Sequence, residues 1–112
     1  MALNLDPEAE YARDLAKRCV AEGGQLDVDS LLPALYHGSR LKDLFPGLSR
    51  HISRPVERRT QTPAEVPVAP ALKPVLRQLA APEVGVVTPE SWFLALLQSP
   101  PGRQYALGAG VS

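Results

Sequence analysis

Apolar and charged residues recur with a helical period near the start of the chain. Between residues 11 and 21 the apolar positions lie three or four residues apart, and charged residues fill the spaces between them. Asp6 is placed to cap a helix start, and Pro7 suits the first helical position, where its missing N–H is not needed. The pair Gly23 and Gly24 favours a stop. This pattern predicts an amphipathic helix that begins at Pro7 and ends before Gly23.

Two more apolar segments complete the first half of the chain. Asp29 and Ser30 lead into an apolar run that ends near Gly38, with Pro33 in or near its first turn. A shorter apolar segment at 41–48 is long enough for one or two turns. The first half therefore predicts three helical pieces.

The second half repeats this alternation of apolar runs and stop signals. The segment 72–79 has helical spacing and is halted by Pro82. The clearest helix start in the chain follows, with Thr88 as the cap, Pro89 at the first position and Glu90 in the first turn. The run after it is apolar on nearly every side, which indicates burial on more than one face. We therefore predict an all-α fold.

The composition indicates one small domain with an aliphatic core. The chain has 112 residues, of which 45% are hydrophobic but only 5% aromatic, so leucine, valine and alanine must form most of the core. The residues that we expect to be buried together are Leu15, Leu32, Leu35, Leu76, Phe93, Leu96 and Leu97.

The segment 49–70 has the composition of a linker. It carries several prolines and four arginines and has almost no large apolar residues. We interpret it as a solvated connector. The alternative is a basic contact surface for an anionic partner, which the lack of interleaved aromatic residues disfavours for a nucleic acid.

The two halves of the chain repeat each other. When the second half is laid on the first, 11–48 aligns with 72–109 without a gap, and seven of the aligned positions are identical. Ordinary composition would give about two or three identities by chance. The identical pairs are Leu15 with Leu76, Glu22 with Glu83, Gly24 with Gly85, Ser30 with Ser91, Ala34 with Ala95, Leu35 with Leu96 and Gly47 with Gly108. Two short helical units of this kind would pack as one pseudo-twofold bundle.

The repeated pattern resembles the N-terminal repeat domain of the Clp family of AAA+ unfoldases. Each family repeat has a Thr-Pro-Glu-His or Gly-Thr-Glu-His start followed by an aliphatic run. The second copy here reads TPESWFLALLQSP and the first reads DVDSLLPALYHGS. The end of the chain, with Leu107 and Gly108, is similar to the later Leu-Gly turn of the family.

This resemblance implies a single Clp N-like domain over residues 1–112. It consists of a first repeat at 8–48, the linker at 49–70 and a second repeat at 71–112. The chain departs from the family where the helix that usually closes each repeat is replaced by the linker and where the last helix is absent. We therefore expect a divergent member and a fragment of a longer protein.

The resemblance also suggests the candidate binding residues. Asp29 and Glu90 occupy matching helix starts, and in some family members the matching acids receive cationic groups of substrates or adaptors. Ser30 and Ser91 stand where the family has histidine, and we include them as candidate protein-binding residues. A purely structural role is the alternative for Asp29 and Glu90, because the helix dipole alone stabilises a first-turn carboxylate by about 0.3–1 kcal/mol.

Several classes of function are disfavoured by the residues themselves. The 12 basic and 12 acidic residues cancel, which argues against a nucleic-acid partner. The single cysteine, Cys19, suits a reducing cytoplasm, where we expect the protein, and fits a small buried residue better than a reactive thiol. No apolar run approaches membrane-spanning length, and the acidic MALNLDPEAE start is unlike a signal peptide, so we expect no membrane partner.

The sequence predicts a binding domain and not an enzyme. Its two histidines, His37 and His51, supply no nucleophile, base and orienting acid, and the chain has no phosphate-binding loop. We expect no cofactor in this domain, with ATP and Mg²⁺ bound only in the motor modules. The resemblance implies that the domain holds client or adaptor proteins near the entrance of a Clp-type hexamer and its peptidase. The alternative is a free-standing Clp-like accessory protein that binds and regulates a Clp protease.

Overall fold

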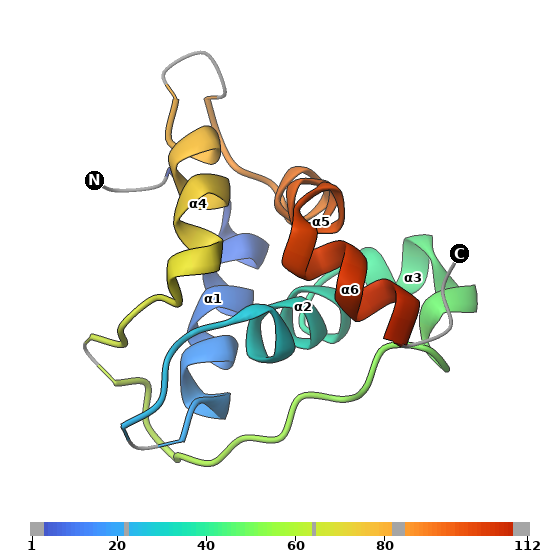
Figure 1. The fold of residues 1–112 in the computed structure, drawn as a ribbon. Coiled ribbons are helices and arrows are strands. Elements are labelled where there is room, and N and C mark those ends of the chain that lie inside the picture. The colour runs from blue at the N-terminus through green and yellow to red at the C-terminus, as the bar shows by residue number, and fades with distance from the viewer. Residues whose placement is uncertain (1–3, 22, 64, 82–84, 109–112) are drawn as a thin grey trace.

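The expected all-α architecture is confirmed in the computed structural model, which describes residues 4–21, 23–63, 65–81 and 85–108 (Figure 1). The helices in this part of the chain are α1 (Pro7–Cys19), α2 (Val28–His37), α3 (Leu41–Leu44), α4 (Lys73–Leu79), α5 (Pro89–Gln98) and α6 (Pro100–Gly108), with 3₁₀ turns η1 (Pro46–Leu48) and η2 (Pro70–Leu72). None of the described helices is long and apolar enough to cross a bilayer. The expected stop at Pro82 and the aligned pair of Glu22 with Glu83 lie outside the described residues.

The first helix begins as the sequence predicts. The carboxylate of Asp6 accepts a hydrogen bond of 2.8 Å from the N–H of Ala9, and Pro7 occupies the first helical position. The helix ends at Cys19, and Gly23 then turns the chain with a φ of 80°, a conformation that strongly favours glycine.

The start of α2 places Asp29 as expected but Pro33 deeper in the helix than expected. The cap is Asp27, which the sequence analysis did not single out, and the helix begins at Val28 with Asp29 in its first turn, as expected for this acid. Pro33 consequently lies at the sixth helical position and not in the first turn. It has no N–H to donate to the carbonyl of Asp29.

The helices α2 and α5 match in length, phase and capping. Both have the same length, and the sequence alignment that superimposes Ser30 on Ser91 also superimposes their first and last residues. Asp27 and Thr88 each accept a hydrogen bond from the N–H three residues later, and a serine hydroxyl accepts a bond from the cap N–H in both helices. The residues Leu35 and Leu96 occupy the same position along their helices, and both are fully buried.

Two isolated β-bridges cross between the halves of the chain. Leu5, just before α1, pairs with Val87, just before α5, while Leu26, just before α2, pairs with Val68, just before η2. The backbone hydrogen bonds at both bridges span 2.6–3.0 Å. The segment that leads into α2 or α5 is thus paired with the other half of the chain.

The buried residues of α1 and α4 do not match in the gapless sequence alignment. They match when the second half is shifted by two positions, so the alignment needs a gap of two residues between these helices and the next. The fully or nearly buried pairs are Ala9 and Leu72, Ala12 and Val75, and Ala16 and Leu79. The expected match of Leu15 with Leu76 joins a buried residue to a partly buried one. The difference arises because the chain from Pro70 to the start of α5 is two positions shorter than the chain from Pro7 to the start of α2.

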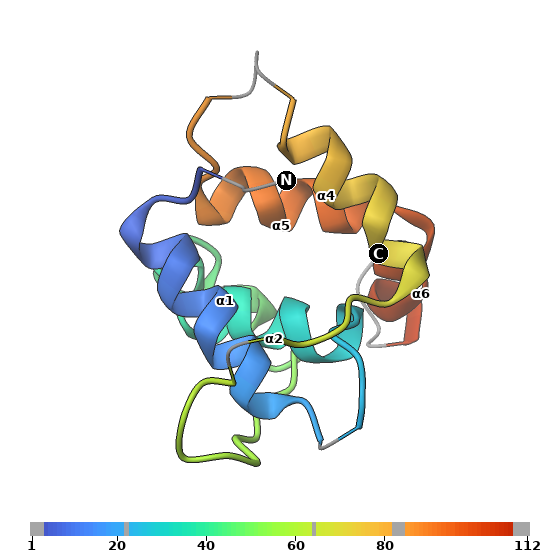
Figure 2. The ribbon, with the colours of Figure 1, turned by 90° about the vertical axis from the view of Figure 1, so that its left-hand side faces the viewer.

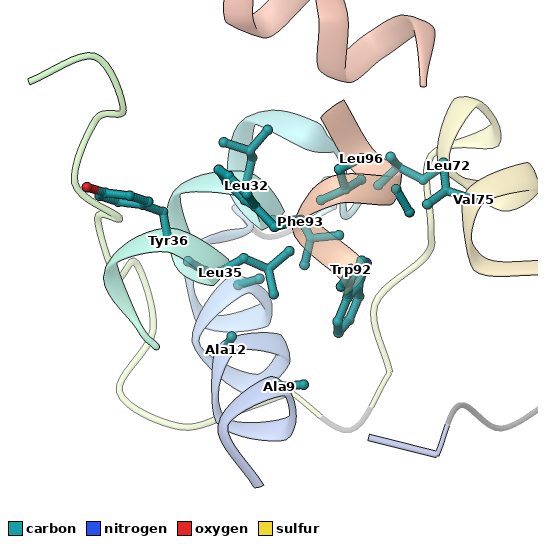
Figure 3. Packing of buried hydrophobic residues seen from close by; sticks show 14 of the residues in the cluster. Ala9, Ala12, Leu32, Leu35, Tyr36, Leu72, Val75, Trp92, Phe93 and Leu96 are labelled. Carbon is teal, nitrogen blue, oxygen red and sulfur yellow. The ribbon is translucent and has the colours of Figure 1, made fainter. Parts of the chain in front are cut away.

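The core is one cluster to which both halves of the chain contribute. The helix α1 packs on α2, α2 packs on α5, and α5 packs on α4 and α6, so that α4 and α5 lie over α1 and α2 (Figure 2). Of the expected core, Leu15, Leu32, Leu35, Phe93 and Leu96 are buried, whereas Leu76 and Leu97 are partly buried against it. The largest fully buried side chains, Trp92 and Tyr36, were not in that set (Figure 3).

The linker packs more closely than a solvated connector. Ile52 is buried in the core, and the N–H groups of Arg58 and Arg59 both donate to the carbonyl of Arg18 at the end of α1. The guanidinium of Arg18 also contacts Glu57 at 2.6 Å. The linker is therefore held against α1 by backbone and side-chain contacts.

A change at the centre of the core is expected to be costly. Leu96→Ala removes a fully buried side chain and should lower the free energy of unfolding by about 2–5 kcal/mol, measured by urea denaturation. Leu94→Ala is the matched control on the same helix, because Leu94 is 56% exposed. A loss at Leu96 no larger than the loss at Leu94 would contradict this account of the core.

The corner between α5 and α6 requires glycine at position 102. A Cβ at Gly102 would overlap the carbonyl oxygen of Leu96, and this atom is backbone that cannot turn away. Gly102→Ala should therefore destabilise the protein by more than about 1 kcal/mol, read from the thermal midpoint. Gly47→Ala is the control, since a Cβ there meets no atom within 4 Å; equal midpoints for the two variants would refute the close approach.

Candidate functional site

The two candidate serines serve as helix caps. The hydroxyl of Ser30 accepts from the N–H of Asp27 at 3.2 Å, and the hydroxyl of Ser91 accepts from the N–H of Thr88 at 3.0 Å. Each hydroxyl also lies 3.0–3.1 Å from the carbonyl of its cap residue. Both serines thus have local partners that account for their presence without a ligand.

Glu90 has an intramolecular partner that the sequence did not indicate. Arg40, between α2 and α3, donates from Nε and Nη2 to the two carboxylate oxygens of Glu90 at 2.6 and 2.7 Å. The same guanidinium contacts Glu8 at 2.6 Å and Asp6 at 3.5 Å, and the backbone N–H of Arg40 donates to Glu8 at 2.8 Å. Arg40 therefore ties the starts of α1 and α5 to the end of α2. We call Arg40, Asp6, Glu8 and Glu90 the Arg40 cluster.

The cluster has a defined electrostatic consequence. The hydrogen bonds from Arg40 lower the pKa of Glu90 below its ordinary value of 4.5, although partial burial acts in the opposite direction. The same bonds, first to Glu90 and then to Glu8, raise the pKa of Arg40 further. Glu90 is therefore an ionised group already engaged by a cation of its own chain.

Asp29 is in a different environment from Glu90. It is exposed and makes no ion pair with any residue that the structure describes. It lines a hollow of about 400 Å³ between the end of α1, the start of α2 and the linker, which Arg54 and Arg58 also line. The two acids that match in sequence are thus not equivalent: Asp29 is open and Glu90 is engaged.

Cys19 lines the same hollow but is a poor nucleophile. Its burial, followed by the charge of Glu57, raises the pKa of the thiol. Its neutral form is therefore favoured, as expected for a packing residue. The cysteine is only partly buried, which differs slightly from the buried residue that the helical pattern predicts.

A second hollow is more apolar. It is a groove of about 650 Å³ between α1, the linker and α4, and we call it the Trp92 groove. Six of its nine lining residues are apolar, and its charged residues are Arg13 and Lys17 on the α1 side and Glu65 on the linker side. The apolar lining consists of Leu26, Val66, Pro67, Val68, Leu76 and Trp92.

Trp92, which lines this groove, carries an unsatisfied polar atom that is buried. Its side chain projects from α5 into the core cluster that also contains Ala9 and Ala12 of α1 (Figure 3) and is 1% exposed. Within the described residues, its Nε1 is the buried side-chain nitrogen or oxygen that lacks a hydrogen-bond partner. Leaving such a donor unpaired costs about 1–3 kcal/mol.

Sequence reasoning identified the two acids but missed Arg40 and Trp92 as parts of a site. Trp92 belongs to the apolar run that follows Thr88, and nothing local in the sequence marks an indole whose N–H is unpaired. Residues 40–59 hold six basic and two acidic side chains, and Arg40 is one of the basic ones. Its partners Glu8 and Glu90 lie 32 and 50 residues away, where no local signal reaches. No family model, curated protein or solved structure matches this chain.

The Arg40 cluster predicts an acid-sensitive contribution to stability. Because the pKa of Glu90 is lowered in the folded state, this contribution is fully present above the ordinary value of 4.5 and is lost as pH falls through the folded-state value. The unfolding midpoint of Glu90→Gln should therefore lie below that of the wild type near pH 7, and the gap should close on acidification. Arg40→Met should behave likewise, whereas Lys42→Met, at the neighbouring lysine, should keep the wild-type profile. A gap that is constant from pH 7 to pH 3 would contradict the ion pair.

Proposed function

We propose that this chain is a non-catalytic, protein-binding N-terminal domain of a Clp-type ATP-dependent unfoldase. One observation carries the proposal: α2 and α5 match in length, in capping box and in the burial of Leu35 and Leu96, all in a single register. A doubled helical unit of this kind is what the resemblance to the Clp N-terminal repeat domain implies.

The crossed β-bridges support the same interpretation. If the two halves of the chain are exchanged, Leu5 takes the place of Val68 and Val87 takes the place of Leu26. One bridge is then superimposed on the other. Units related by a two-fold axis pair in this reciprocal manner, because a contact of one position with another is matched by the reverse contact. We propose that 8–48 and 71–112 are two copies of one unit, joined by the linker at 49–70, in one domain over 1–112.

The surface chemistry supports binding by Asp29 in particular. Its carboxylate is exposed in the first turn of α2, where the helix dipole favours the ionised form, and it borders a hollow that can admit a side chain. We propose that Asp29 receives a cationic group of a client or adaptor protein. ATP and Mg²⁺ would act only in the motor modules of the assembly, in the cytoplasm, and the peptidase would act downstream.

The different environments of Asp29, which is exposed, and Glu90, which is bound by Arg40, allow a sharper test of this function. Asp29→Ala should weaken the binding of a client or adaptor while leaving the melting temperature nearly unchanged, since Asp29 makes no ion pair in the described structure. Glu90→Ala should lower the melting temperature and affect binding less, because it removes the carboxylate that pairs with the Arg40 guanidinium. Titration calorimetry with candidate Clp adaptors at two ionic strengths measures the effect.

Salt dependence provides the second readout. Binding through an exposed carboxylate should weaken as salt rises, and this dependence should be lost when Asp29 is replaced. The double variant, Asp29→Ala with Glu90→Ala, should bind no better than Asp29→Ala alone. Unchanged affinity in folded Asp29→Ala would return this acid to a structural role.

A further inference from the structure

Three hydroxyl groups of the chain lie immediately before a proline, and the fold places them in different environments. They belong to Thr62, Thr88 and Ser99. Protein kinases of the proline-directed class transfer phosphate to a serine or threonine that proline follows, and they bind this dipeptide in an extended, accessible segment. The fold therefore decides which of the three hydroxyl groups such a kinase can reach.

Thr88 and Ser99 are committed to the two ends of α5. The Oγ1 of Thr88 accepts from the N–H of Ser91 at 3.1 Å, and this bond caps the helix. Ser99 is 8% exposed, and its hydroxyl donates to the carbonyl of Leu96 at 2.5 Å. A phosphate on either oxygen would break a bond at a helix end, and at Ser99 it would also bury charge. Neither residue is a suitable site in the folded chain.

Thr62 lies in a segment that the fold leaves accessible. Its side chain is exposed, and residues 60–63 belong to no helix or β-bridge. The backbone groups of 60–63 make no hydrogen bond within the described structure. A kinase can therefore bind this segment without breaking any backbone hydrogen bond that the structure describes.

A cation of α1 already contacts the Thr62 hydroxyl. Nη1 of Arg18 donates to Oγ1 of Thr62 at 3.1 Å, and Nε of the same guanidinium donates to Glu57 at 2.6 Å. A phosphate on Oγ1 would replace a neutral acceptor by an anion that binds the guanidinium more strongly. The dipole at the end of α1 opposes an anion here, but it contributes less than a hydrogen bond to a charged group.

We infer that Thr62 is a phosphorylation site for a proline-directed protein kinase, and that Arg18 binds the phosphate. The γ-phosphoryl group of ATP passes to Oγ1: its bond to the oxygen of ADP breaks, a bond to Oγ1 forms, and a carboxylate of the kinase takes the hydroxyl proton. The new contact adds to the bonds that the N–H groups of Arg58 and Arg59 donate to the carbonyl of Arg18. The modification therefore fastens the linker more tightly to α1, and this effect does not depend on the proposed function.

Phosphorylation of the full chain tests the choice of site. The kinase is one that phosphorylates three synthetic peptides, each containing Thr62, Thr88 or Ser99 with its flanking residues. The folded chain is treated with this kinase, ATP and Mg²⁺, and the phosphate is located by mass spectrometry. We expect phosphate at Thr62 and at neither of the other two sites. Incorporation should be lost in Thr62→Val and retained in Thr60→Val, the matched control on the same exposed segment.

Phosphorus NMR of the modified chain tests the role of Arg18. A cation beside the phosphate favours the dianion, so the wild-type phosphate should ionise at a pH about 0.2–0.7 lower than in Arg18→Gln, as for an exposed charge pair. Glu57→Gln should lower the ionisation pH further, because Glu57 competes for the same guanidinium. Arg50→Gln, at an exposed linker arginine without an ion pair in the described structure, should match the wild type.

Three results would overturn the inference. The first is phosphate at Thr88 or Ser99 of the folded chain as fast as in their free peptides. The second is no phosphate at Thr62 of the folded chain under conditions that modify its peptide. The third is the same ionisation pH of the phosphate in the wild type, Arg18→Gln and Glu57→Gln.

Discussion

The contact between α2 and α5 is the interaction on which the rest of the fold depends. Helices as short as these are not stable alone in water, because nucleation costs more than a few intrahelical bonds return. These two helices gain stability by burying Leu35, Leu96 and Phe93 in one cluster, where the ring of Tyr36 also lies 6.2 Å from the ring of Phe93. The other helices pack around this pair, so the core exists only when both halves of the chain are present.

The Arg40 cluster breaks the approximate symmetry that the matching helices create. One guanidinium joins three acids from two helix starts, and its aligned counterpart in the second half is Pro101, which has no charge. The start of α5 is therefore neutralised from within, while the start of α2 faces solvent with an uncompensated carboxylate. The two matching helix starts thus present different surfaces: the carboxylate of Glu90 is held by Arg40, and the carboxylate of Asp29 is exposed.

Local sequence signals predicted most of the helices, did not mark α6, and predicted the long-range contacts poorly. Asp6 before Pro7, and Thr88 before Pro89, mark helix starts through bonds that span three residues, and both starts are confirmed. At α2 the cap Asp27 bonds to Ser30 as Thr88 bonds to Ser91, and the alignment of the two halves already places Asp27 on Thr88, so this start could have been located from the repeat. The acids of the candidate site could likewise be located from their place in the repeat, but whether each was free depended on Arg40, whose partners are 32 and 50 residues distant.

The crossed β-bridges have a consequence for assembly. Each half of the chain completes its pairing with the other half, and the halves are joined by a long connection that is largely outside the core. The first half of one molecule could pair instead with the second half of another molecule. Such an exchange would keep both bridges and the buried contacts between a first half and a second half. The closed monomer is favoured by the high effective concentration that the connection provides and by the contacts of the connection with α1. Shortening that connection below its required span would turn the same set of contacts into a domain-swapped dimer.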